Sequence, residues 1–244
     1  MGLSSNTIIH FTKKKEALEG ILKNNFNINY CIEKILLENK SIEFFVPMVS
    51  FCDIPLSQVK NHIDSYGSYG IGLTKKWAER QKLNPVLYTE NNSSLSKSLR
   101  NALVGFLRNQ DEGLKVLEEK EKSLLDILRY VKNYQADLIR KDMETIPNYR
   151  FSDEREWRYV LGYDKTNKFL CSANNNNKAD LNNSILGHKL KFEPNDIKYV
   201  IINNDSEIKD FIEILREAKS KYNSEDVERL ITRIITTEQI REDF

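Results

Sequence analysis

The stretch of residues 46–88 constrains the fold most strongly, because it holds three of the nine glycines and three of the five prolines. Glycine permits backbone conformations that other residues avoid, and proline fixes φ and donates no backbone hydrogen bond. The apolar residues between them predict strands over residues 46–52, 68–74 and 85–88, and a short helix over residues 54–64. The repeated Tyr-Gly pair at 66–70 combines backbone freedom with flat, hydrogen-bonding side chains, so it is a candidate ligand-binding wall.

Length and charge narrow the class of protein. A chain of 244 residues buries roughly 70 to 75% of its unfolded surface, so a substantial core is expected. The 37 lysines and arginines nearly cancel the 36 aspartates and glutamates, which leaves no global field to steer the chain toward nucleic acid or a membrane. A charged partner therefore needs a local patch. Lysines 13–15 and 75–76 offer one for phosphate, although a lysine run is usually a solvated face.

The cysteines and the N-terminus point to a reduced compartment. Cys31, Cys52 and Cys171 are odd in number and lack CxxC spacing, which fits a cytoplasmic protein without structural zinc. The first eleven residues do not form a secretory signal, and no apolar run approaches the ~20 residues that span a bilayer. We expect a cytoplasmic protein with no membrane partner.

The N-terminal residues predict a strand followed by a helix. Residues 7–11 form a short apolar run, and Thr12 is a plausible N-cap for a helix over residues 13–24. His10 then lies near the carboxyl end of the first strand, where open sheets tend to place functional groups. The charged residues 32–40 indicate a surface helix or loop.

The middle of the chain predicts a helical hairpin. A polar linker at residues 91–97 leads into helices over about 95–109 and 112–143, in which leucines recur at helical spacing. Such a stripe usually packs into a core. A homodimer formed through the long second helix is the alternative.

A charged strand is expected after Pro147, which ends the helical region. Over residues 153–161, strand alternation places Glu154, Glu156 and Arg158 on one face. Two carboxylates beside an arginine could act as a general acid, as a general base or in binding a sugar. A solvated sheet edge is the competing interpretation.

The C-terminal third completes an α+β pattern. The asparagine-rich residues 173–183 indicate an exposed, mobile loop. Two strands over residues 186–192 and 197–203 follow, and Ser206 and Ser224 are the expected N-caps of two last helices. Strands and helices in successive runs favour an α+β fold, here a single domain over residues 1–244 with a helical insertion at about 95–143.

Common catalytic motifs do not occur in the sequence. It contains no phosphate-binding glycine loop, HExxH, GxSxG or paired CxxC. Of the three histidines, His62 and His188 are expected to be structural, and His10 is the better functional candidate because of its strand-end position.

Several segments together resemble the AbiGi family of bacterial abortive-infection proteins, which are described as phage-resistance antitoxins. The resemblance spans about residues 7–215 and rests on the segments IHFT (9–12), PMVSFCDIPL (47–56), YGSYGIGLT (66–74), NPV (84–86) and EREWR (154–158).

More distantly, the chain is similar to the ADP-ribosyltransferase fold, including DarT-like toxins that modify DNA. That resemblance implies NAD as a substrate. His10, Thr12 and Ser50 would then hold the nicotinamide ribose or support the site, Tyr66 or Tyr69 would stack on nicotinamide, Glu156 would be catalytic, and Glu154 would orient the acceptor.

Two functions therefore remain open from the sequence. One is an anti-phage enzyme that transfers ADP-ribose to an acceptor such as nucleic acid, or cleaves NAD. The other is a non-catalytic antitoxin or regulator that binds a toxin or nucleic acid. A cleft that unites His10, a tyrosine and Glu156 would favour the enzyme.

Overall fold

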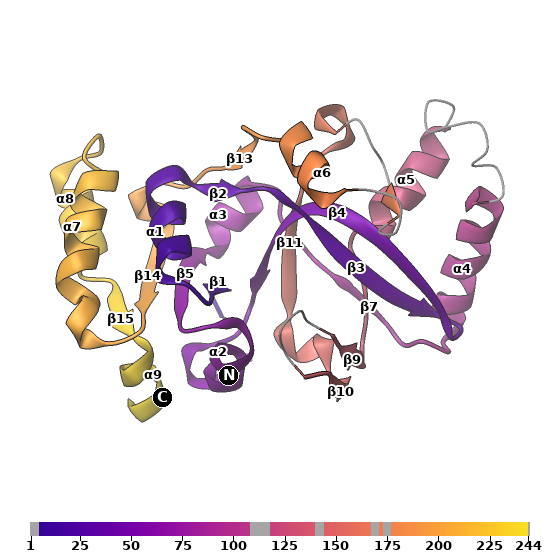
Figure 1. Ribbon diagram of the computed structural model, residues 1–244, viewed down its shortest axis with the longest axis horizontal. Helices are drawn as coiled ribbons and strands as arrows, with labels where there is room; N and C mark the ends of the chain where they lie inside the picture. Colours follow the sequence, from indigo (N-terminus) through magenta and orange to yellow (C-terminus); the bar gives the residue numbers. More distant parts are fainter. Residues whose placement is uncertain (1–4, 108–117, 140–143, 167–170, 173–176, 244) are drawn as a thin grey trace. The chain divides into compact units, whose positions relative to one another are not determined.

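The chain forms two compact units of mixed α+β structure, in a computed structural model (Figure 1). Unit 1 comprises Met1–Asn27, Val49–Asn84 and Gly187–Phe244, and unit 2 comprises Ile28–Met48 and Pro85–Leu186. The structure describes residues 5–107, 118–139, 144–166, 171–172 and 177–243. This agrees with the predicted α+β class, whereas the single domain with a helical insertion stays a prediction. None of the helices in the described ranges is long and apolar enough to cross a membrane.

Unit 1 is built on a sheet whose inner strand β1 pairs antiparallel with both neighbours. The strand order is β15 (Ile234–Thr236), β14 (Ile197–Ile202), β5 (Tyr69–Thr74), β1 (Thr7–Thr12) and the last residues of β4 (Lys40–Cys52). A small separate sheet pairs β2 (Phe26–Asn27) with β13 (Lys189–Leu190). The helices of the unit are α1 (Lys15–Asn24), α2 (Lys60–Tyr66), α3 (Lys75–Arg80), α7 (Ile208–Ala218), α8 (Ser224–Ile231) and α9 (Thr237–Asp243).

The alternation of side chains along β1 divides the interior of unit 1. Ile9 and Phe11 pack into a buried cluster with Cys52, Ile54, Val59, Ile63, Ile201 and Ile240. Because successive strand residues point to opposite faces, His10 points the other way, where its ring contacts Phe26 and Phe51. The strand pattern therefore removes His10 from the aliphatic core and places it among aromatic rings.

The predicted strands of unit 1 are confirmed as β1, β5 and β14, but the helix at the N-terminus begins later than expected. Thr12 is the last residue of β1, and α1 starts only at Lys15. The N-cap residue Lys14 makes no side-chain cap bond, so the prediction that Thr12 caps this helix is wrong. The helix expected over residues 54–64 is a 3₁₀ turn (Leu56–Gln58) followed by α2.

The C-terminal helices are also capped by other residues than those predicted. Asn223 caps α8 in place of Ser224, and Asn204 caps a 3₁₀ turn (Asp205–Glu207) that precedes α7, which itself has no side-chain cap bond. Asparagine caps as well as serine does, so shifts of one or two residues follow from the local competition between polar side chains. The last predicted helix is interrupted by β15, which pairs parallel with β14.

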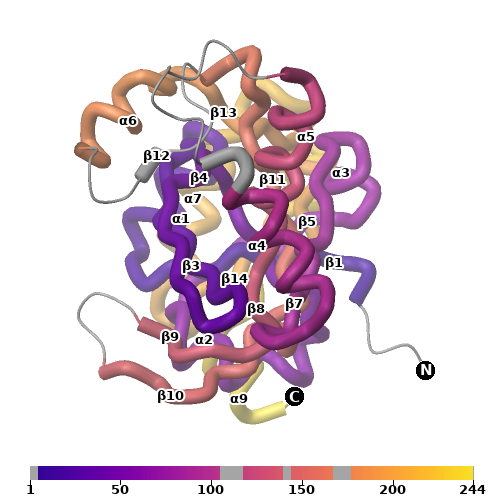
Figure 2. Tube along the Cα trace, turned by 90° about the vertical axis from the view of Figure 1, so that its right-hand side faces the viewer, coloured from indigo at the N-terminus to yellow at the C-terminus, as the bar shows by residue number. Residues whose placement is uncertain are grey.

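Unit 2 is organised around an antiparallel hairpin of β3 (Asn29–Leu37) and β4. Its two-residue turn, Glu38-Asn39, has φ values of 49° and 60°. The helices α4 (Ser94–Leu107) and α5 (Glu119–Leu128) pack against each other (Figure 2). They place Leu103, Leu125 and Leu128 in one cluster with the apolar side chains of the hairpin, among them Ile35, Leu37, Phe44 and Val46.

Short strands and one more helix complete unit 2. Strand β7 pairs parallel with β8, β9 pairs antiparallel with β10, and β12 pairs antiparallel with β4. β6 (Asn84–Pro85) lies where the chain passes from unit 1 into unit 2. The remaining elements are β7 (Leu87–Thr89), β8 (Val131–Asn133), β9 (Ala136–Leu138), β10 (Ile146–Tyr149), β11 (Glu156–Val160), β12 (Cys171–Ser172) and α6 (Lys178–Ser184).

Two sequence predictions for unit 2 are wrong. The segment 32–40 forms most of β3 and the turn into β4, not a surface helix or loop. Within the described part of 112–143, the long helix is helical only as α5, because Val131 begins a strand that pairs with β7. Residues 112–117 and 140–143 lie outside the described ranges, and the homodimer through this segment stays a prediction.

Two further predictions fail in part. Residues 178–184, expected in a mobile loop, form α6, while residues 173–176 lie outside the described ranges. The strand expected over 186–192 is reduced to β13, and Pro147, expected to end the helical region, lies within β10.

Lys219, at the end of α7, is a buried cation of unit 1. It is 3% exposed, and its Nζ lies 4.5 Å from the centroid of the Phe192 ring. Burial, together with repulsion from Lys221, lowers the pKa of Lys219 to about 8 from the ordinary lysine value of 10.5. The folded state therefore disfavours the charged form of this side chain.

Gly67 is predicted to be intolerant of any side chain. Its φ is +119°, and a Cβ there would lie 2.5 Å from Cα and 2.6 Å from N of Lys13. Gly67→Ala should lower the free energy of unfolding by about 2 kcal/mol or more, as measured by urea denaturation. Gly20→Ala is the matched control: a Cβ meets nothing within 4 Å inside α1, so we expect a gain of about 0.5–1 kcal/mol. Equal effects of both changes would contradict the packing of Gly67.

Lys219→Met should change how stability depends on pH. Because the folded pKa of about 8 is below the ordinary 10.5, the unfolded chain binds more protons between these values. Lys219 should therefore make the free energy of unfolding of the wild type increase with pH between pH 8 and 10.5. We expect the variant to exceed the wild type most at pH 7 and progressively less toward pH 10, in urea denaturation at several pH values. An advantage that does not change with pH would contradict the assignment, and Lys198→Met, at an exposed lysine of β14, is the control.

Candidate functional site

The segment EREWR of residues 154–158 bends sharply before it becomes a strand. Glu154 ends a 3₁₀ turn (Phe151–Glu154), Arg155 has a left-handed φ of 45°, and β11 begins at Glu156. Glu154 therefore does not share a strand face with Glu156, as the alternation predicted. The solvated-edge interpretation is also wrong, because Glu154, Glu156 and Arg158 are 4%, 5% and 0% exposed.

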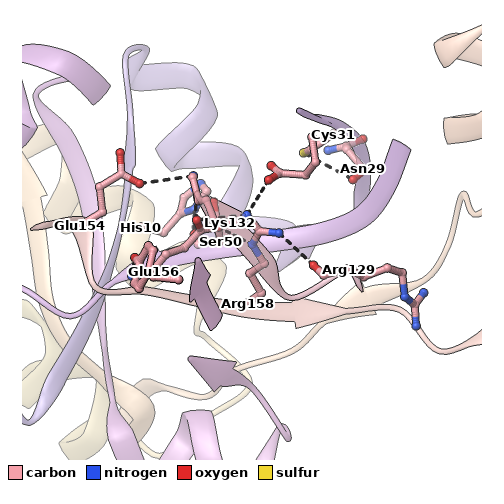
Figure 3. Close-up of polar contacts among 11 residues, drawn as sticks. His10, Asn29, Cys31, Ser50, Arg129, Lys132, Glu154, Glu156 and Arg158 are labelled. Carbon is pink, nitrogen blue, oxygen red and sulfur yellow. Dashed lines mark hydrogen bonds and ion pairs between the residues drawn. The ribbon is translucent and has the colours of Figure 1, made fainter. Parts of the chain in front are cut away.

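Arg158 lies at the centre of the buried charges (Figure 3). Its Nε donates to Glu156 Oε1 at 2.6 Å, and one terminal nitrogen donates to Glu33 Oε2 on β3 at 2.7 Å. Its other terminal nitrogen donates to the backbone oxygen of Arg129 at 2.8 Å. The guanidinium thus ties β11 to the β3–β4 hairpin and to the residue that follows α5.

Lys132, on β8, connects the two glutamates of the segment. Its Nζ lies 2.8 Å from Glu156 Oε2, 3.5 Å from Glu154 Oε2 and 4.7 Å from the centroid of the Phe151 ring. Burial alone would raise the pKa of Glu156, but Arg158 and Lys132 lower it to about 2. Burial alone would lower the pKa of Lys132, but the carboxylates of Glu156 and Glu154 raise it overall. Glu156 is therefore ionised at any physiological pH.

We call this set the charge cluster: Glu33, Lys132, Glu154, Glu156 and Arg158. It combines three carboxylates with two cations. A buried group of this kind is expensive unless each member is paired. Three of the four ion pairs measure 2.8, 2.7 and 2.6 Å, and the Lys132–Glu154 pair measures 3.5 Å.

His10 of unit 1 is held in one tautomer. Its Nδ1 lies 2.8 Å from the backbone oxygen of Ser50, and because a carbonyl only accepts, Nδ1 carries the hydrogen. Burial lowers the pKa of His10 below the ordinary value of 6.5, against the opposing effect of the Ser50 bond. The ring is therefore neutral near pH 7, and Nε2 presents a lone pair.

The tyrosines of the Tyr-Gly pair already have protein partners. Tyr66 stacks on His62 with a centroid distance of 4.1 Å, and the Tyr69 hydroxyl donates to Glu207 at 2.8 Å. Burial first, and then this bond, raises the pKa of Tyr69 to about 12. Thr12 is the register partner of Tyr69 across β1 and β5.

The structure thus brings the predicted site residues together in two sets. Unit 1 pairs His10 with Ser50 and Thr12 with Tyr69, and unit 2 joins Glu154 to Glu156 through Lys132. A cleft that unites the two sets stays a prediction.

Two members of the charge cluster, Glu33 and Lys132, were not recognised in the sequence. Glu33 lies in the segment 32–40, which was expected to be a surface helix or loop. Lys132 lies in the segment that was expected to be the long helix. Correct strand assignments would have marked both as charged residues facing inward.

The fold and the site define an α+β protein with a buried charge cluster around a Glu-Trp-Arg strand. Over residues 24–203 the chain matches the family described as "Putative abortive phage resistance protein AbiGi, antitoxin", and it belongs to that AbiGi family. It is 28% identical over 244 residues to the abortive phage resistance protein AbiGi of Lactococcus lactis subsp. cremoris, covering 89% of this chain and 96% of that relative. No solved structure matches significantly, so the ADP-ribosyltransferase fold stays a prediction.

Replacing Arg158 is predicted to be severely destabilising. Arg158→Met leaves Glu156 and Glu33 buried without their shared cation, which should cost about 3–5 kcal/mol of unfolding free energy. Arg150→Met is the control, because Arg150 is exposed and its guanidinium lies 6.0 Å from the Tyr134 ring. The control should change stability by less than about 0.5 kcal/mol. A comparable loss in both variants, measured by urea denaturation, would contradict the central place of Arg158.

Proposed function

We propose that this AbiGi-family protein acts in abortive phage resistance through an NAD site that contains Glu156. The reaction would be the transfer of ADP-ribose to an acceptor, such as a nucleic acid, or to water. The observation that supports the proposal is the ionised carboxylate of Glu156, which Arg158 and Lys132 hold in a buried place. A fixed negative charge in a water-poor site stabilises positive charge that develops in a reaction.

The residues of the cluster fit that task in specific ways. NAD as the substrate would supply a glycosidic bond whose cleavage releases nicotinamide and leaves positive charge on the ribose. Arg158 and Lys132 hold the carboxylate of Glu156 through three bonds, which leaves one of its about four acceptor positions for a ribose hydroxyl. Glu154 would orient the acceptor or take its proton, with Lys132 balancing its charge.

His10, in unit 1, has a hydrogen-bonding capacity of its own. Its Nε2 lone pair can accept a hydrogen bond from a ribose hydroxyl, while the Ser50 carbonyl keeps the ring oriented. Thr12 would support the same group, and Tyr66 or Tyr69 would stack on nicotinamide. These roles are part of the proposal and come from the resemblance to ADP-ribosyltransferases.

A second candidate is a non-catalytic antitoxin that binds a toxin protein, as the family description suggests. Within the part of the chain that the structure describes, the large hydrophobic side chains that are exposed all lie in unit 2. Isolated exposed hydrophobics are ordinary, but their restriction to one unit indicates a surface for a protein partner. They are Ile32, Leu87, Leu95, Ile127, Tyr134, Ile139, Ile146 and Leu186.

The enzyme proposal predicts nicotinamide release by the purified protein. Glu156→Gln keeps the shape but removes the charge, so we expect release from NAD to fall about 100-fold or more. Release is followed by chromatography, and circular dichroism checks that the variant is folded. Glu43→Gln is the matched control: the Glu43 side chain on β4 is 40% exposed, and the change should leave the rate of nicotinamide release unchanged.

The outcomes separate the two candidates. Release that persists in Glu156→Gln removes Glu156 from the mechanism. Folded wild-type protein that neither releases nicotinamide nor binds NAD rejects the enzyme and leaves the antitoxin. Growth arrest caused by this chain alone would count against a pure antitoxin.

A further inference from the structure

Strand β3 has an outer edge that no other strand covers. Within the described ranges, β3 pairs with β4 alone. Leu37 and Lys40 flank the two-residue turn and form the first hydrogen-bonded pair of the hairpin, so the odd-numbered residues of β3 bond to β4. The backbone N–H and C=O groups of the even-numbered residues therefore point away from β4.

Side-chain amides cap this outer edge at both ends. The backbone nitrogen of Tyr30 donates to Asn182 Oδ1 on α6 at 2.8 Å. The backbone nitrogen of Leu36 donates to Asn133 Oδ1 on β8 at 2.7 Å, and the backbone oxygen of Leu36 accepts from Asn133 Nδ2 at 2.8 Å. These bonds agree with the outward direction of the even-numbered residues, and they hold α6 and β8 beside the two ends of the strand.

Ile32 and Lys34 lie between the two caps, and their outward backbone groups remain open. Within the part of the chain that the structure describes, these groups bond to no other residue. Ile32 is 53% exposed, and Lys34 is exposed as well. The edge therefore presents two N–H donors and two C=O acceptors at strand spacing, beside an apolar side chain. We call these outward backbone groups of Ile32 and Lys34 the β3 notch.

We propose that the β3 notch binds an extended segment of another protein as an added strand. A backbone in the strand conformation offers the same alternation of donors and acceptors at the same spacing, whereas a helix uses its backbone groups internally. The exposed side chain of Ile32 favours an apolar residue beside it in the added strand.

The two caps favour a single extended segment over a second copy of this chain. A second copy would bring its own α6 and β8 to the contact together with its β3, because its edge is bracketed in the same way. A single extended segment is narrow enough to reach a gap of two residues, which is about 7 Å long. NAD takes no part in this contact, so strand addition and nicotinamide release are separate properties of the chain.

Hydrogen exchange at the Ile32 and Lys34 amides tests the β3 notch directly. In the protein alone, both amides should exchange at least about 10-fold faster than the amide of Leu36, which is bonded to Asn133. The probe for binding is a library of random peptides of about ten residues, selected on the immobilised wild type. A selected peptide should slow exchange at Ile32 and Lys34 about 10-fold or more.

A matched pair of variants separates the backbone of Ile32 from its side chain. Ile32→Pro removes the outward N–H and spares the pairing with β4, because an edge strand tolerates proline where its N–H faces solvent. We expect Ile32→Pro to bind the selected peptides about 10-fold more weakly than the wild type. Ile32→Val keeps the N–H and should bind them like the wild type. Circular dichroism checks that both variants are folded.

The remaining outcomes contradict the proposal. Slow exchange at Ile32 and Lys34 in the protein alone would show that the notch is already occupied. A library that yields no peptide able to slow these amides, or peptides that bind Ile32→Pro as tightly as the wild type, would overturn strand addition. A wild-type dimer that Ile32→Pro abolishes would give the edge to a second copy. If Ile32→Pro does not fold, the exchange measurements on the wild type decide.

Discussion

The buried guanidinium of Arg158 is the interaction on which unit 2 depends. It is fully buried, yet it contacts a carboxylate on its own strand, a carboxylate on β3 and a backbone oxygen just after α5. Arginine suits this place because its planar fork donates in several fixed directions and remains charged when buried. Without it the surrounding carboxylates would repel one another, and β11 would keep only its backbone pairing with β4 of the hairpin. The charge cluster therefore couples the correct folding of unit 2 to the correct placement of Glu156.

Family membership and the site geometry bear on different levels of function. Membership in the AbiGi family places the chain among proteins described as phage-resistance antitoxins. Within the described residues, the charge cluster holds Glu156 ionised and buried, and large apolar side chains of unit 2 are exposed. The first feature is the basis of the proposed enzyme, and the second is the basis of the proposed antitoxin.

The parts of the fold that follow from local sequence were predictable. The apolar runs of β1, β5 and β14 identify themselves as strands, and the strand-end position of His10 follows from the first of them. β3 was missed because the charged residues Glu33 and Lys34 resemble a surface segment. Arg158 and Glu33 lie 125 positions apart, and no local pattern announces a contact over that distance. The two-residue turn Glu38-Asn39 was the available signal, because asparagine tolerates the positive φ that a tight hairpin demands.

The fixed tautomer of His10 determines which hydrogen bonds its ring can form. Because Nδ1–H is committed to the Ser50 carbonyl, Nε2 can accept a hydrogen but has none to give. Burial keeps the ring neutral, so a second donor does not arise near pH 7. A single backbone contact, which no substitution of the Ser50 side chain removes, thus makes this ring a pure acceptor at its second nitrogen.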